Sequence, residues 1–306
     1  MSRDGLGFRP RERQKMKFED ASKMYMADRA KRLRATTLEG YDSAIRRHLE
    51  PAWSGRNIEE ITHEELQTWL DSIPTAGAAD KAFKTFRQIY RWTIRKHQLR
   101  IWDVTQGIEL PKVRTSKRDR MTAHDERLML REIMGKPYEA VVLAAASLGL
   151  RPSEASGLDW GDVDWRSGWV HVQRSAHTVK GGVTVEYGCK TDLADRWLKL
   201  PRWALERLRQ LRGQRRAGRL RGDLSPKCIY SRLKRLLKNI GLPSISMEAL
   251  RHSWATIAIE SGAALADVAV ALGHTSVEMC RRHYLMSTRA VVERAELAFS
   301  RAVVAP

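Results

Sequence analysis

A stretch without hydrophobic periodicity divides this chain into two parts. Residues 111–120 read PKVRTSKRDR, which is dense in charge and carries no apolar pattern. Apolar residues recur at helical or strand spacing on both sides of this stretch. Because 306 residues are enough for two domains of ordinary size, we interpret residues 112–120 as a linker between two domains.

The part before the linker is predicted to be helical. Residues 1–15 are polar and basic and indicate a flexible arm. Between residues 16 and 111, apolar side chains recur at helical spacing. Thr36 begins a capping-box pattern, and Pro51 is expected to end the helix that follows it. Another long helix is expected from about Ala79 to His97.

In the part after the linker, the spacing of apolar residues changes from helical to strand-like and back to helical. A capping signal at Thr122 opens a helical region, and residues 137–150 are nearly all apolar, which predicts a buried helix. Helical patterns return from residue 203. Between these helices, three short strands are expected at residues 168–173, 182–187 and 197–201. The predicted fold is mainly α with a small antiparallel sheet, an α+β fold in which residues 121–306 form a mixed α/β domain.

The charge balance indicates the kind of partner. Lys and Arg number 55 against 36 Asp and Glu, so the formal net charge is +19. A surplus of this size favours a polyanion, because each phosphate that is neutralised releases counterions. Nucleic acid is therefore the expected partner, with a basic soluble protein of another kind as the alternative. The linker is interpreted either as lying on DNA or as a solvated connection.

Other features argue against several classes of protein. The longest apolar run, residues 140–150, is well short of the roughly 20 residues that cross a bilayer. The N-terminus lacks the apolar core of a signal peptide. Cys189, Cys228 and Cys280 show no metal-ligand spacing, and free thiols suit a reducing compartment. We expect a cytoplasmic protein with no membrane partner, no cofactor and no metal ion.

A few polar side chains in the second part could cleave a phosphodiester without a metal. Two arginines on separate elements, such as Arg151 and Arg251, can hold both non-bridging oxygens of a phosphate. A tyrosine such as Tyr284 can attack the phosphorus, and a lysine of lowered pKa can protonate the departing oxygen. Each residue also has a structural interpretation, a helix-end salt bridge for Arg151 and a core anchor for Tyr284.

The motifs around these residues resemble the tyrosine recombinases, the phage-integrase family. The matching segments are Arg151-Pro152-Ser153-Glu154, Leu250-Arg251-His252, Leu272-Gly273-His274 and, ten residues after His274, Tyr284. The resemblance is strong over residues 121–290 and weaker over 16–111, where length and helix content carry it. It implies a helical core-type DNA-binding domain followed by a catalytic domain. Because only about 15 residues precede the first domain, we expect the two-domain type without an arm-binding domain.

The resemblance also implies a role for each matching residue. Arg151 and Arg251 would clamp the phosphate, and His274 would donate to one of its oxygens. Tyr284 would be the nucleophile. Lys190, in the turn that follows the second expected strand, would be the general acid. The weaker candidates are Lys180 for the acid, and Tyr187 and Tyr230 for the nucleophile.

One position departs from the family pattern. Three residues before Arg251 the family usually has histidine, and sometimes lysine, whereas this chain has Glu248. An ionised carboxylate there would repel the scissile phosphate. Glu248 could instead act as a base toward Tyr284, donate a hydrogen bond when protonated, or pair with an arginine. The sequence leaves these alternatives open.

The function implied is site-specific recombination of double-stranded DNA through a 3′-phosphotyrosyl intermediate, in phage or mobile-element integration or excision. The working form would be a homotetramer on paired sites, with a directionality factor as a further potential partner. Two alternatives remain: a type IB topoisomerase, and a DNA-binding architectural protein whose site has decayed at Glu248. The apolar tail after Tyr284 is expected to pack either on a neighbouring protomer or on its own domain.

Overall fold

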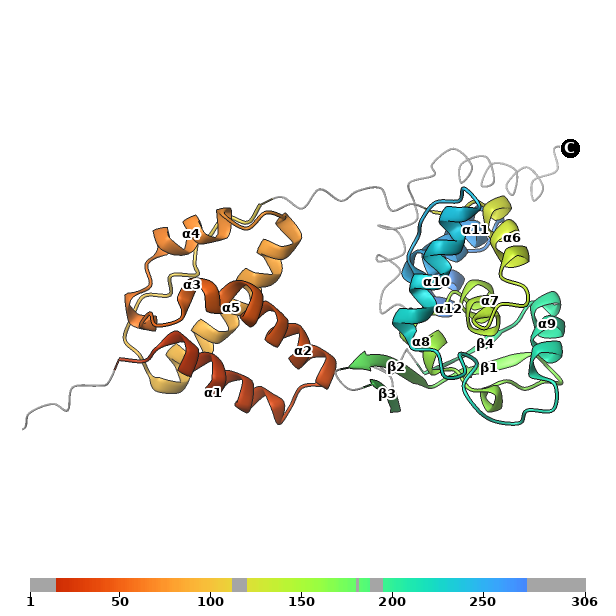
Figure 1. The fold of residues 1–306 in the computed structure, drawn as a ribbon, viewed down its shortest axis with the longest axis horizontal. Coiled ribbons are helices and arrows are strands. Elements are labelled where there is room, and N and C mark those ends of the chain that lie inside the picture. Colours follow the sequence, from red (N-terminus) through yellow and green to blue (C-terminus); the bar gives the residue numbers. More distant parts are fainter. Residues whose placement is uncertain (1–14, 112–119, 180–181, 188–194, 274–306) are drawn as a thin grey trace, which may run out of the picture. The chain divides into compact units, whose positions relative to one another are not determined.

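The chain divides into two compact units, Met1–Ser116 and Lys117–Pro306, in the computed structural model shown in Figure 1. The structure describes residues 15–111, 120–179, 182–187 and 195–273. Each unit has a hydrophobic core of its own.

The described part of the first unit is a bundle of helices around an aromatic core. The ring of Phe86 stacks on Phe18 and on Tyr90, each with ring centroids 5.6 Å apart. Long α5 supplies much of this core along one buried face. The helical elements are α1 (Phe18–Ala30), α2 (Ala35–Ala44), a π-helical turn (Ile45–Leu49), α3 (Glu50–Trp53), a 3-10 turn (Ile58–Glu60), α4 (His63–Asp71) and α5 (Ala76–His97).

Two predicted helix boundaries in this unit are wrong. Thr36 does not cap α2, because it lies inside the helix. The helix begins at Ala35, and Arg34 occupies the capping position in an extended conformation. Pro51 does not end the helical run either. It lies in the first turn of α3, directly after the π-helical turn. A proline is tolerated in a first turn because its missing N–H would have no partner within the helix.

The second unit is built around the buried helix that the sequence predicts. All ten residues of α7 are buried, and α7 contacts α8, α9 and α11. Thr122 caps α6 as expected, since its hydroxyl accepts from the N–H of Asp125 and the Asp125 carboxylate accepts from the N–H of Thr122. The helices are α6 (Ala123–Glu132), α7 (Glu139–Leu148), α8 (Pro152–Gly157), a 3-10 turn (Trp160–Asp162), α9 (Arg202–Arg212), α10 (Pro226–Asn239), α11 (Met247–Glu260) and α12 (Leu265–Leu272).

The described strands number four rather than the predicted three. β1 (Trp169–Val172) pairs with β4 (Arg196–Lys199), and β2 (Arg174–Val179) pairs with β3 (Gly182–Tyr187), both antiparallel (Figure 1). β2 is not predicted from the sequence, because its residues, RSAHTV, bury only Ala176 and so lack an alternating apolar pattern. The predicted class, mainly α with small antiparallel sheets, is confirmed. Among the described helices, none has both the length and the apolar character to cross a membrane.

Close packing at the end of α7 positions the second half of this unit. Gly149 ends the helix with φ +62°, a left-handed conformation that favours glycine. A Cβ atom there would lie 2.8 Å from the indole of Trp254 in α11 and 3.1 Å from Leu272 in α12. The Trp254 indole N–H also donates to the carbonyl of Ser147 at 3.2 Å. The ends of α7 and α12 therefore meet against α11, two residues before Arg151.

Gly149→Ala should destabilise the protein by more than backbone strain alone. A non-glycine residue in the left-handed region costs about 1–2 kcal/mol, and the new methyl group would also collide with Trp254. Gly135→Ala is the matched control, because Gly135 has φ +72° and open space where its Cβ would lie. Urea unfolding of both variants measures the difference. Equal losses would contradict the tight contact between Gly149 and Trp254.

Candidate active site

Three guanidinium groups converge on the carboxylate of Glu154 in α8. Arg151 donates from Nη1 to Oε1 at 2.7 Å, and its backbone N–H donates to Oε2 at 2.8 Å. Arg196 donates to both oxygens, at 3.1 and 3.0 Å. Nη1 of Arg251 lies 3.9 Å from Oε2. We call Arg151, Arg196 and Arg251 the arginine cluster, and Glu154 is its common partner.

The arginine cluster also binds the C-terminal end of α12. The last carbonyls of a helix lack partners within the helix and carry partial negative charge, so they favour cations. Each of three consecutive carbonyls accepts from a different arginine. The bonds run from Arg196 Nε to Ala271 O at 2.8 Å, from Arg251 Nη2 to Leu272 O at 2.5 Å, and from Arg151 Nη2 to Gly273 O at 3.4 Å.

Each arginine reaches the cluster from a different element. Arg151 is the capping residue of α8, held extended before Pro152. Arg196 is the first residue of β4, and Arg251 lies on the buried face of α11. Nη1 of Arg251 also donates to the carbonyl of Gly149 at 3.1 Å. The turn at the end of α7 and the end of α12 are thus joined by one side chain.

The electrostatics of the cluster favour binding an anion. Burial opposes ionisation of Glu154, but hydrogen bonds and charge from Arg196, with help from Arg151, lower its pKa from 4.5 to about 2. Burial, and then the charge of Arg151, lowers the pKa of Arg251 from 12.5 to about 10. Both groups therefore remain charged at neutral pH. Three guanidinium groups and one carboxylate leave two net positive charges at the site.

The structure brings together two of the predicted site residues, Arg151 and Arg251. Glu248 lies exposed in the first turn of α11, and its charge raises the pKa of Arg251, against the larger effect of burial. Lys190, His274 and Tyr284 lie outside the residues that the structure describes. Within the described ranges, no group of three His, Cys, Asp or Glu side chains could hold a metal ion.

Arg196 is not among the site residues that the sequence predicts, and the interpretation of Glu154 from sequence is that it orients or supports a helix rather than contacting phosphate. Arg196 was part of a polar turn between two expected strands. A signal for it exists, because side chains alternate between the faces of a strand. Arg196 shares its face with Leu198, which is buried, whereas Trp197 and Lys199 are exposed. A charged residue on the buried face of a strand needs a partner of opposite charge.

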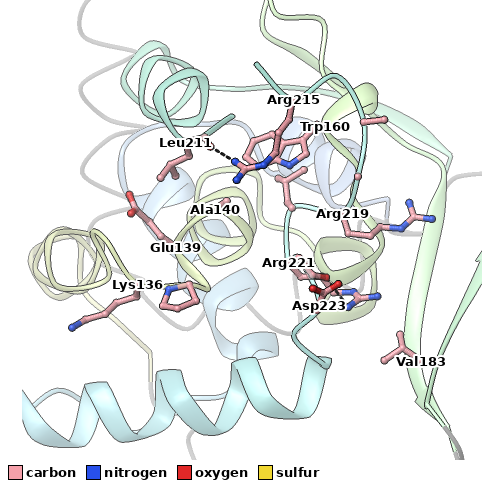
Figure 2. A pocket seen from close by; sticks show the side chains of 15 residues that line it. Lys136, Glu139, Ala140, Trp160, Val183, Leu211, Arg215, Arg219, Arg221 and Asp223 are labelled. Carbon is pink, nitrogen blue, oxygen red and sulfur yellow. Dashed lines mark hydrogen bonds between the residues drawn. The ribbon is translucent and has the colours of Figure 1, made fainter. Parts of the chain in front are cut away.

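A pocket of about 750 Å³ elsewhere in this unit is also lined by basic side chains, but they are different residues from those of the arginine cluster (Figure 2). Arg215 donates to the carbonyl of Leu211 at 2.9 Å, Arg219 to that of Gly157 at 3.0 Å, and Arg221 to that of Ser156 at 3.2 Å. No member of the arginine cluster lines this pocket. The candidate active site is therefore the arginine cluster, not this pocket.

Comparison with known sequences decides the family. The Phage integrase family matches residues 119–290, and the Phage integrase N-terminal SAM-like domain matches residues 17–73. The chain belongs to the phage integrase family of tyrosine recombinases. The arginine cluster and Glu154 all lie within the first of these matched regions.

Individual relatives have related sequences, and solved structures share the fold. The chain is 23% identical over 261 residues to a prophage phiRv2 integrase of Mycobacterium tuberculosis, covering 79% of this chain and 68% of the relative. It is 26% identical over 282 residues to the tyrosine recombinase XerD of Bifidobacterium longum, covering 85% and 90%. The Tn1549 transposon integrase in complex with transposon right end DNA has a similar fold, with a TM-score of 0.78 at 15% identity over 93% of this chain and 100% of that one. The structure of a lambda integrase tetramer bound to a Holliday junction is also similar, with a TM-score of 0.69 at 18% identity, covering 89% of this chain and 78% of that one.

Glu154→Gln should destabilise the protein at neutral pH but not in acid. The folded-state pKa of Glu154 is below its ordinary value, so its contribution is fully present above pH 4.5 and is lost as the pH falls toward 2. A pKa lowered from 4.5 to about 2 corresponds to about 3 kcal/mol. Urea unfolding of wild type and variant at pH 7 and below pH 4 should show this difference shrinking.

The control for this experiment is Glu206→Gln. Glu206 pairs with Arg202 at 2.9 Å on the surface of α9, where a salt bridge contributes about 0.5 kcal/mol or less. A gap between wild type and Glu154→Gln that stays constant with pH would contradict the ionised, arginine-bound state of Glu154.

Proposed function

We propose that this chain cleaves and rejoins double-stranded DNA as a site-specific recombinase, with the scissile phosphate bound at the arginine cluster. The observation that carries the proposal is the convergence of Arg151 and Arg251 beside Glu154, with two net positive charges. A phosphate in the transition state carries extra negative charge, which fixed guanidinium groups stabilise without reorganising.

The two arginines would contribute in different ways. The Arg151 side chain is 34% exposed and can present its guanidinium to a phosphate that arrives from solvent. The Arg251 side chain is 2% exposed and is fixed by the carbonyls of Gly149 and Leu272. Arg151 would therefore bind the phosphate directly, and Arg251 would add a fixed charge where water screens it little.

The remaining steps are assigned by resemblance to the family. The Tyr284 oxygen would attack the phosphorus, lose its proton to a base, for which Glu248 is a candidate, and form a 3′-phosphotyrosyl ester. The bond from phosphorus to the 5′-oxygen would break, and Lys190 would give a proton to that departing oxygen. His274, directly after Gly273, would donate to a phosphate oxygen. Attack of a 5′-hydroxyl on the ester would reverse these steps and rejoin the strand. None of these side chains would require a metal ion or a nucleotide.

The proposed partner is double-stranded DNA, bound by a homotetramer on paired sites. Support comes from the net charge of +19 and from the solved structures of similar fold, one on transposon end DNA and one a tetramer on a Holliday junction. The relatives named as prophage integrase and tyrosine recombinase favour integration or excision of a mobile element. A directionality factor and a location in the cytoplasm belong to the same proposal.

Tyr284→Phe should abolish covalent capture of DNA. Removing the phenolic oxygen removes the attacking atom while leaving the arginine cluster intact. The measurement is incubation with a nicked suicide substrate followed by denaturing electrophoresis, in which only a covalent adduct persists. Tyr230→Phe is the control and should form the adduct at the wild-type rate. An adduct that survives Tyr284→Phe would exclude Tyr284 as the nucleophile.

Glu248→His should preserve or raise the cleavage rate. A negative charge beside a phosphate costs on the order of 1 kcal/mol in water, which is about fivefold in rate. Single-turnover cleavage of the same substrate measures the effect. Glu260→His makes the same substitution at the opposite end of α11 and should leave the rate unchanged. A large loss in Glu248→His alone would show that the carboxylate has a dedicated role, such as the base toward Tyr284.

A further inference from the structure

We propose that Arg196 is a positioning residue for strand cleavage, which holds Glu154 and the end of α12 so that Arg151 and Arg251 keep their places. The inference rests on the proposed function and deepens it. Arg196 itself would not touch the phosphate, because Nε, Nη1 and Nη2 all donate to protein groups and the side chain is only 8% exposed.

One guanidinium joins two elements that are distant in sequence. Both terminal nitrogens of Arg196 bind the Glu154 carboxylate in α8, and Nε binds the Ala271 carbonyl in α12. Only a planar fork with donors in fixed directions can make these bonds together. Lysine has the charge but offers a single nitrogen, so it cannot reproduce the arrangement.

Loss of Arg196 would disturb the phosphate clamp through Glu154. The buried carboxylate would keep Arg151 at 2.7 Å and Arg251 at 3.9 Å as its cationic neighbours in the cluster. A buried charge that loses a partner moves toward the partners that remain or takes up a proton. Either response shifts the guanidinium of Arg151, which is the accessible donor.

Arg196 also fixes the start of β4 against α8 and the end of α12. It is the first residue of β4, six residues after Lys190. The bonds of Arg196 thus join three parts of the catalytic unit: α8, the end of α12 and the start of β4.

The test compares Arg196→Met and Arg196→Lys with wild type in the full-length protein. Single-turnover cleavage of a nicked suicide substrate is measured at saturating protein, and duplex affinity is measured separately. A displacement of about 1 Å at a reacting group costs about 100-fold in rate. We expect both variants to cleave about 100-fold more slowly, with the dissociation constant for duplex DNA changed by about twofold or less.

Arg207→Met is the control for a general loss of stability. Arg207 binds both oxygens of buried Glu139, at 2.6 and 3.1 Å, in the same unit but with no residue of the cluster involved. This variant should lower the thermal unfolding temperature, as we also expect of Arg196→Met, and still cleave at the wild-type rate. If Arg196→Met fails to fold, Arg196→Lys, which keeps the charge, decides the matter.

Several results would overturn the inference. These are wild-type cleavage by Arg196→Met, full rescue by Arg196→Lys, or an equal slowing in Arg207→Met. In each case, a covalent DNA adduct formed by the wild-type protein would still support the proposed function. Absence of any adduct with the wild-type protein would instead overturn the proposed function, and the role of Arg196 with it.

Discussion

The catalytic unit depends on the interaction between the ionised carboxylate of Glu154 and three guanidinium groups. Three guanidinium groups repel one another strongly when water is removed, and the lowered pKa of Arg251 reflects both burial and its charged neighbours. One buried carboxylate and the carbonyls at the end of α12 compensate that repulsion. Because the compensation is incomplete, a net positive charge remains. The unit can therefore hold its arginines in place before DNA binds, and their charge stays available to a phosphate.

This arrangement requires close approach of backbones as well as charge. Gly149 lets α7 end against Trp254, and its carbonyl then meets the guanidinium of Arg251. The same arginine reaches the carbonyl of Leu272, so helix packing and the polar network are one structure. A side chain at Gly149 would disturb both. The arginine cluster is thus positioned by α8, β4 and α11, which suits a reaction that relies on positioning.

The parts that the sequence predicted correctly have local causes. Thr122 caps α6 through contacts within a single turn, and α7 is apolar on every side because it lies inside the core. The errors arise where neighbouring structure changes a local preference. Pro51 is accommodated because it falls in the first turn of α3, and β2 pairs with β3 although the β2 sequence shows little strand pattern.

The sequence by itself determined the helix content, the positive charge that favours a polyanion and two members of the candidate site, Arg151 and Arg251, because motifs and composition can be read from short stretches of chain. Only the tertiary structure assigned Arg196 to the same site and gave Glu154 its central place. Residues 151, 196 and 251 are separated by 45 and 55 positions along the chain. Their meeting depends on how α8, β4, α11 and α12 pack, and no local pattern of residues specifies a contact over such distances.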